Sequence, residues 1–193
     1  MPAVALVFHG PMNYPATKNL RNALCAYGGC LPIQTQGGAI FDKVFLMMAS
    51  DGGSIEEAVT LYNLIETLPA EVVAVNMGQI ASAGILPFLG AGERWASNHS
   101  YFHFHNLSWT YNPAQVVHRI QMADHVNIID KERALYRAIL HENSALTDAD
   151  FETLKLLDQP LVWDASTAKD KGIIQEIGCP DIPQGTPFFN VDY

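Results

Sequence analysis

Apolar runs typical of buried strands alternate with segments of helical spacing along most of this 193-residue chain. The expected strands cover residues 4–8, 43–49, 71–76, 100–105 and 173–177. The expected helices cover residues 15–26, 55–68, 83–89, 113–142, 148–157 and 165–171. This alternation predicts an α/β fold with a largely parallel sheet, because a helix between two strands returns the chain to the same edge of the sheet. The chain shows no internal repeat and no linker that would divide it.

Several expected helices begin and end at residues with capping chemistry. Ser54 and Glu57 have the spacing of a capping box at the start of the second helix. Thr147 and Asp164 are the expected N-caps of the two short helices, and Gly172 is expected to end the last one.

The expected helix over residues 113–142 would run for about thirty residues, well above the usual length of a helix. Asn112, Pro113 and Gln115 are suited to its start, with proline at the first helical position. Because a small domain rarely buries so long a helix, we expect it to project and to pack on a second subunit. The proline-rich segment over residues 179–193 is expected to form a C-terminal arm beside the main domain of residues 1–178.

Composition excludes several classes of protein. A net charge of −9 argues against a nucleic-acid-binding surface, and no apolar run reaches transmembrane length. The N-terminus lacks the basic region of a signal peptide, so the expected location is cytoplasmic. Cys25, Cys30 and Cys179 lack the spacing of a zinc site, so we expect reduced thiols, no metal and no cofactor.

Two turns between an expected strand and an expected helix carry residues suited to catalysis. Gly52 and Gly53 follow the second strand, where two glycines let backbone amides point into a cavity. Ser82 follows the third strand, at a turn where a hydroxyl is projected and free amides of the helix start can bind negative charge. A plain turn and a packing serine are the alternative interpretations of these two features.

Histidines and acids follow later in the chain. Strand alternation places Tyr101, His103 and His105 on one face, so either histidine is a candidate general base. Asp158 and Asp164 are both candidates for the acid that orients it. The order of glycine pair, serine, histidine and aspartate fits acyl transfer, since a serine needs a base, the base needs a carboxylate, and the oxyanion needs amide donors.

These segments resemble the proteolytic subunit of the Clp protease. That family has a strand ending in Ser-Pro-Gly-Gly, a Gly-x-Ala-Ser elbow, a strand ending in a histidine motif, a long handle helix and a late aspartate. The matching segments are Ser50-Asp51-Gly52-Gly53, Gly78-Gln79-Ile80-Ala81-Ser82-Ala83-Gly84, His103-Phe104-His105-Asn106-Leu107, the helix from Pro113, and Leu156-Leu157-Asp158-Gln159-Pro160. The resemblance extends from about residue 4 to residue 178.

The resemblance implies a ClpP/crotonase-type spiral fold of repeated β-β-α units, with the long helix as a handle between subunits of a ring. It implies a serine endopeptidase that acts on peptides or unfolded polypeptides inside an oligomeric chamber. Ser82 would be the nucleophile, His105 the base and Asp158 the orienting acid, and the amides of Gly53 and Ala83 would form the oxyanion hole.

The chain also departs from the family pattern. Asp51 replaces the family's proline, and Pro87 lies just inside the helix after Ser82, where it is expected to kink that helix. The chain starts almost at its first strand, without the family's N-terminal segment that engages an ATP-driven unfoldase. We therefore expect a diverged peptidase that acts alone, with docking to such an ATPase left open. An inactive Clp-like scaffold and a crotonase-type acyl-CoA enzyme are the alternative functions.

Overall fold

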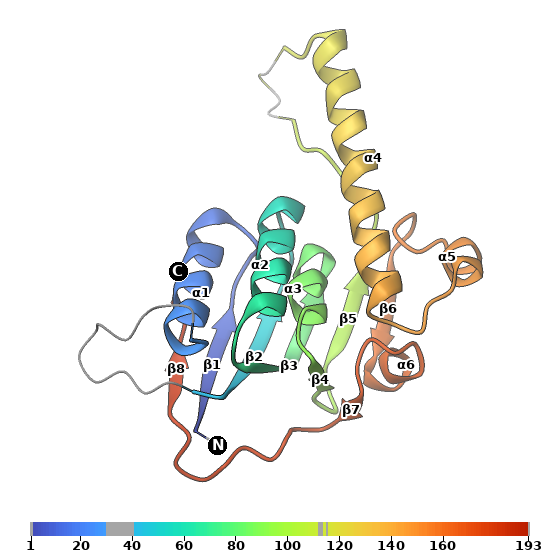
Figure 1. Ribbon diagram of the computed structural model, residues 1–193. Helices are drawn as coiled ribbons and strands as arrows, with labels where there is room; N and C mark the ends of the chain where they lie inside the picture. The colour runs from blue at the N-terminus through green and yellow to red at the C-terminus, as the bar shows by residue number, and fades with distance from the viewer. Residues whose placement is uncertain (1, 30–40, 112–113, 115, 193) are drawn as a thin grey trace.

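The computed structural model describes residues 2–29, 41–111, 114 and 116–192. It contains one eight-stranded sheet whose strands run in the order β6-β5-β3-β2-β1-β8, while β4 pairs with both β3 and β7 (Figure 1). The strands are β1 (Ala3–His9), β2 (Lys43–Ser50), β3 (Glu71–Ala81), β4 (Glu93–Ala96), β5 (Tyr101–Phe104), β6 (Leu161–Asp164), β7 (Glu176–Ile177) and β8 (Phe188–Asn190).

Every pairing in the sheet is parallel except that of β5 with β6. The long strand β3 divides its outer edge between two neighbours. Its first half pairs with β4, from Val73 opposite Glu93, and its last residues pair with β5, from Gln79 opposite Tyr101. This arrangement confirms the predicted α/β class, and it places the ends of β2, β3 and β5 close together.

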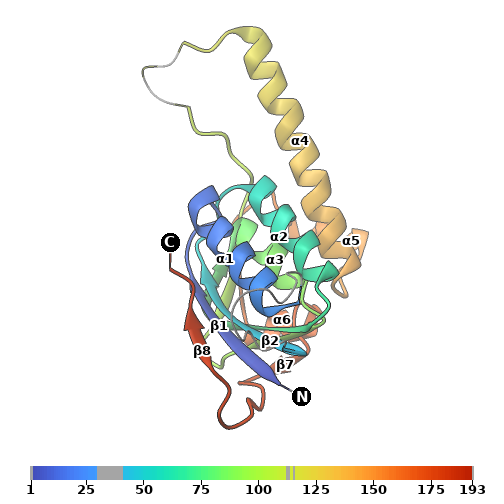
Figure 2. The same ribbon diagram turned by 60° about the vertical axis from the view of Figure 1, so that its left-hand side comes forward.

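The helices are α1 (Tyr14–Tyr27), α2 (Ile55–Thr67), α3 (Ile85–Leu89), α4 (Arg119–Glu142), α5 (Asp148–Leu154) and α6 (Ala165–Asp170), with a 3-10 turn, η1 (Ser82–Gly84), before α3. Figures 1 and 2 show α1, α2 and α3 side by side over one face of the sheet. Their buried side chains, such as Leu20, Leu24 and Leu61, form the main core with Leu6 and Leu46 of the sheet. The burial of these apolar side chains supplies the main driving force for folding.

The other face of the sheet has its own small apolar cluster. Ala5, Phe45 and Val73 are buried there, and Ile182 from the C-terminal segment packs against them. The same segment then adds β8 beside β1, with Ala5 opposite Phe188. The C-terminal residues therefore close both this face and one edge of the sheet.

The second helix begins at residue 55 as predicted, but its capping box is only half formed. Ser54 Oγ accepts a hydrogen bond from the Glu57 amide at 3.3 Å, as a capping box requires. The Glu57 carboxylate, however, binds Thr17 and Arg21 of α1 instead of reaching back to Ser54. The hydrogen bond from Thr17 lowers the pKa of Glu57, and the nearby Arg21 acts in the same direction. The second half of the box is thus replaced by a link between two helices.

The helix α4 begins at Arg119, so the prediction that it starts at residue 113 is wrong. His118 is its N-cap, and the Gln121 side chain accepts a hydrogen bond from the His118 amide at 3.0 Å. The two residues before His118, Val116 and Val117, are β-branched and disfavour a helical conformation. The predicted capping residues Asn112, Pro113 and Gln115 lie outside the described residues.

Most of α4 extends away from the sheet, as both views show (Figures 1 and 2). Its buried residues are Tyr136, Ile139 and Leu140, all in its last third. Ile120 keeps 83% of its surface exposed and Val126 keeps 56%. None of the helices in the described part of the chain is long and apolar enough to cross a membrane.

Candidate active site

Ser82 lies at the point where β3 ends and η1 begins. Its φ angle is +50°, in the left-handed region that a non-glycine residue rarely adopts. Such a conformation costs on the order of 1–3 kcal/mol and persists only where the surrounding structure enforces it. The residues after Ser82 are small and buried, which leaves room for this turn. A strained turn from strand to helix is how several hydrolase folds project a nucleophile.

The expected kink at Pro87 does not occur. Pro87 falls in the first turn of the five-residue helix α3, where backbone amides have no partner within the helix. Its missing amide hydrogen therefore removes no helical hydrogen bond. Instead, the expected single helix over residues 83–89 is divided into η1 and α3.

The glycine pair after β2 is held against the serine turn. Gly52 has a φ of +88° and Gly53 has a φ of +145°. A Cβ on Gly52 would lie 2.6 Å from Ser82 Cβ and 2.7 Å from the Ala81 carbonyl oxygen. The two backbones approach this closely only because residue 52 has no side chain.

Hydrogen bonds fix this loop and leave one amide free. The Met12 amide donates to the Gly52 carbonyl at 2.8 Å, and the Ser54 amide donates to the Met12 carbonyl at 2.7 Å. Within the described part of the chain, the Gly53 amide has no hydrogen-bond partner. Ala83 is the second residue of η1, at the start of a helical turn. Amides at such a start have no intrahelical partner and favour negative charge.

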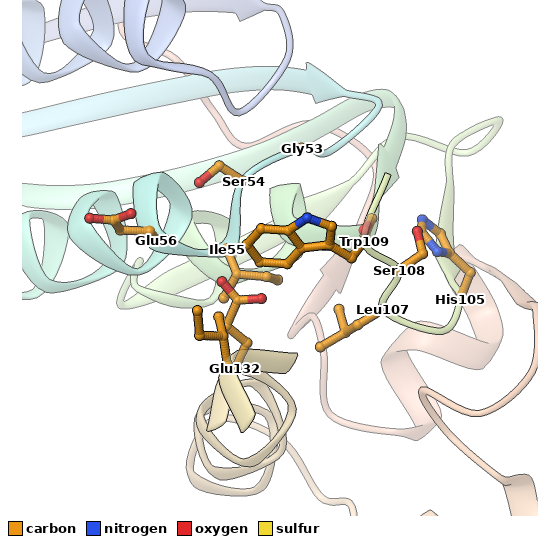
Figure 3. A pocket seen from close by; sticks show the side chains of 11 residues that line it. Gly53, Ser54, Ile55, Glu56, His105, Leu107, Ser108, Trp109 and Glu132 are labelled. Carbon is orange, nitrogen blue, oxygen red and sulfur yellow. The ribbon is translucent and has the colours of Figure 1, made fainter. Parts of the chain in front are cut away.

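A cavity of about 420 Å³ opens at this point (Figure 3). It brings together three residues that are predicted from sequence, Gly53, Ser82 and His105. The other lining residues come from α2, from the segment after β5 and from α4: Ser54, Ile55, Glu56, Leu107, Ser108, Trp109, Ile128 and Glu132. The cavity therefore lies between the glycine loop, the serine turn and the projecting helix.

His105 follows directly after β5 and lines this cavity, whereas His103 does not. His105 Nδ1 lies 2.8 Å from the Asn106 carbonyl oxygen. A carbonyl can only accept a hydrogen bond, so Nδ1 must carry the proton. In the neutral ring this leaves Nε2 unprotonated, which is the state that a general base requires. His103 lies inside β5, opposite Val162 of β6, with its ring 5.5 Å from that of His105.

Neither candidate acid contacts His105 in the described structure. The Asp158 carboxylate is exposed and lies 2.6 Å from Arg133 Nη2 of α4. Asp164 is the N-cap of α6, as predicted, and accepts a hydrogen bond from the Thr167 amide at 2.8 Å. That backbone hydrogen bond lowers the pKa of Asp164. The structure thus brings together the serine, the histidine and Gly53, but not the acid.

Three residues at or near the site are not identified from sequence. The Tyr136 hydroxyl donates to the Ser82 carbonyl at 2.8 Å, so α4 holds the serine turn directly. Burial raises the pKa of Tyr136, which keeps the hydroxyl in its donor form. Its helical spacing to Ile139 and Leu140 could have marked it as buried. Trp109 and Glu132, which line the cavity, lie in segments without a comparable signal.

Metal-binding clusters are not found among the described residues, where no three His, Cys, Asp or Glu side chains gather. Cys25 is partly buried and Cys179 is exposed, while Cys30 lies outside the described part of the chain.

Comparisons with known proteins agree with the predicted resemblance. The family model described as Clp protease matches residues 35–180. A point mutant of ClpP1 from Listeria monocytogenes superposes with a TM-score of 0.72, at 20% identity and 90% coverage of each chain. ClpP1 from the same organism gives a TM-score of 0.69, at 20% identity and 92% coverage of each chain. No curated protein matches the chain significantly. The structural matches confirm the predicted ClpP fold.

Proposed function

Because this chain belongs to the Clp protease family, we propose that it is a serine endopeptidase that acts on peptides or unfolded polypeptides. One observation carries the proposal. Ser82, His105 and Gly53, which are far apart in the sequence, line a single cavity, and Ser82 occupies a strained turn there. A hydroxyl, an imidazole and a free amide in one cavity are the parts that acyl transfer needs.

The proposed reaction begins when His105 Nε2 takes the proton from Ser82 Oγ. The oxygen then attacks the peptide carbonyl carbon, and the resulting oxyanion accepts hydrogen bonds from the Gly53 and Ala83 amides. Collapse of this intermediate breaks the C–N bond, and His105 returns the proton to the leaving amine. A water molecule, deprotonated by His105, then attacks the acyl-enzyme carbonyl. Collapse of this second intermediate releases the carboxylic acid product and regenerates the Ser82 hydroxyl.

Asp158 is the proposed orienting acid, although it is paired with Arg133 in this structure. Both partners are nearly half exposed, at 44% for Arg133 and 46% for Asp158. Exposed ion pairs of this kind contribute only about 0–1 kcal/mol, so exchange of Arg133 for His105 would cost little. Until that exchange, the Asn106 carbonyl holds the histidine ring.

The first test is hydrolysis of a fluorogenic peptide library between neutral and acid pH. We expect turnover that falls toward acid pH, because protonated His105 cannot accept the Ser82 proton. An enzyme that hydrolyses the peptides at a rate independent of pH through this range would contradict the role of His105.

An inactive scaffold of the same fold is the second candidate, because Asp158 does not contact His105 here. It differs from the peptidase in one measurable respect. A scaffold would leave Ser82 unreactive toward a fluorophosphonate at any pH, whereas the proposed enzyme would be modified.

We also propose that the chain assembles into a ring-based homo-oligomer through α4. The support is the exposed apolar surface along this helix, including Ile120, Met122 and Val126. Several large apolar side chains exposed on one projecting helix are typical of an interaction surface. In analytical ultracentrifugation at micromolar concentration, we expect a multimer that the Ile120→Glu substitution converts to smaller species. A monomeric wild-type chain would contradict this assembly.

A further inference from the structure

The cavity beside Ser82 has an acidic wall that the proposed reaction does not use. Glu132 of α4 lines it, and Glu56 of α2 lines it from another side. Figure 3 shows the Glu132 side chain directed from α4 into the cavity, on the side where Trp109 lies. A carboxylate in this position would meet the side chain of a bound substrate.

Resting on the proposed function, we propose that this cavity selects a lysine or arginine side chain on the residue whose carbonyl Ser82 attacks. The substrate class would then be basic peptides rather than peptides with apolar residues at the cleavage point. Glu132 would be the specificity-determining residue, and Glu56 would add a second negative charge at the rim.

The first argument is that Glu132 lacks a partner. In the described part of the chain, its carboxylate makes no ion pair and accepts no hydrogen bond from a side chain. The neighbouring arginines of α4 are already engaged, since Arg133 pairs with Asp158 and Arg137 pairs with Asp148 and Glu152. A partly buried carboxylate without a cation is costly, and a positive side chain in the cavity would relieve that cost.

The electrostatic environment of Glu132 also favours a bound cation. Burial raises the pKa of Glu132, and repulsion from Glu56 raises it further. Both effects oppose the charged form in the empty cavity. A bound ammonium or guanidinium group beside Glu132 would oppose both effects, because a nearby positive charge favours the ionised carboxylate.

The second argument is the shape of the cavity walls. Ile55, Leu107 and Ile128 supply apolar surface in the same cavity as Ser82 and the two acids. Lysine and arginine carry long apolar stems that pack on such surface while the charged end reaches a polar group. The Trp109 ring also faces the cavity, and an indole face attracts cations.

Trp109 is held in place for this role. Its ring stacks on His125 of α4 with the centroids 4.0 Å apart and an angle of 13° between the planes. The Tyr111 hydroxyl is 3.0 Å from His125 Nδ1 and fixes the histidine in turn. The segment after His105 is thus fastened to the same helix that carries Glu132.

The test uses matched fluorogenic peptides that differ only in the residue before the cleaved bond, with arginine, lysine, leucine or glutamate there. For the wild-type chain we expect kcat/KM to be at least about tenfold higher with arginine or lysine than with leucine, and lowest with glutamate. Glu132→Gln keeps the shape and removes the charge. It should lower the arginine-to-leucine ratio about 10- to 100-fold.

Asp130→Asn is the matched control, because it removes one negative charge from an exposed position of the same helix without altering the cavity lining. It should leave the ratio within about twofold of wild type, since a screened surface charge acts weakly at a distance. Circular dichroism of each variant verifies the fold.

The outcomes separate this inference from the function on which it rests. Cleavage of the leucine peptide at the same or a higher efficiency than the arginine peptide would overturn the inference and leave the peptidase intact. An unchanged ratio in Glu132→Gln would also overturn it. If no peptide is cleaved and Ser82 resists a fluorophosphonate, the peptidase itself is wrong, and the inference falls with it.

Discussion

Replacing Ser82 by alanine should reduce peptide hydrolysis by a factor of about 10⁴ or more, to the background of the assay. The reason is that no acyl-enzyme can form without Oγ, and the remaining groups only bind the substrate and its oxyanion. The measurement is kcat/KM with the best fluorogenic peptide, beside the sedimentation of both proteins. Assembly should not change, because Ser82 is buried, with 8% of its surface exposed, and does not lie on the exposed part of α4.

A second serine in the same cavity provides the control for this substitution. Ser108 lines the cavity but does not lie at a strained turn. Ser108→Ala should therefore lower kcat/KM far less than Ser82→Ala, because the Ser108 hydroxyl is not held at a strained turn that projects a nucleophile. Hydrolysis that survives in Ser82→Ala, or is lost only in Ser108→Ala, would refute Ser82 as the nucleophile.

Replacing Gly52 by alanine should lower kcat/KM by about 100-fold, and it should also destabilise the fold by about 1–3 kcal/mol. The new methyl group would lie 2.6 Å from Ser82 Cβ, so either the serine turn or the glycine loop must shift. The φ of +88° at this position adds strain for any residue with a Cβ. Peptide kinetics measure the first effect, and thermal or denaturant unfolding measures the second.

Gly78→Ala is the matched control. Gly78 lies in β3, near the same turn, but a Cβ there would meet nothing within 4 Å, and its φ is not in the left-handed region. The same addition of one methyl group should therefore change neither activity nor stability appreciably. Equal effects of the two substitutions would show that the close approach of Gly52 to Ser82 does not control the site.

The layering of the fold could be predicted from the sequence, whereas several edges of the sheet could not. The runs that form β1, β2 and β3 are long and apolar. Helices cover one face of these strands, and the small apolar cluster on the other face of the sheet buries the opposite side chains. In contrast, β4 and β6 have four residues each and β8 has three. Segments this short are recognised only where they extend an alternating run, as β5 does, and otherwise only their neighbours in the sheet make them strands.

Some helix boundaries could likewise be predicted from the sequence, and others could not. Thr147 and Asp164 cap α5 and α6 as predicted, because a local side-chain oxygen suffices to fix those starts. The start of α4 depends on a box formed by His118 and Gln121, and histidine is not a usual N-cap residue. The expected strand over residues 173–177 is reduced to Glu176 and Ile177, since the Ile173 amide donates to the Ala168 carbonyl of α6 and closes that helix.

At the site, motifs at turns could be identified and contacts across the fold could not. The serine turn and the glycine pair follow from local sequence, because each needs small residues at the end of a strand. The link from Tyr136 to Ser82 spans 54 positions and depends on how the last third of α4 packs against η1 and α3. The pairing of Asp158 with Arg133 likewise depends on where the turn after α5 lies against α4, so no local pattern predicts which partner the acid takes.

The central claim is that Ser82 is an activated nucleophile, and reaction with a fluorophosphonate probe tests it most directly. Intact-mass spectrometry of the treated chain should show one adduct per subunit, and the Ser82→Ala variant should show none. The chain offers further serines in the cavity, Ser54 and Ser108, as internal controls for nonspecific reaction. No adduct on the wild-type chain, or an equal adduct on Ser82→Ala, would contradict the assignment.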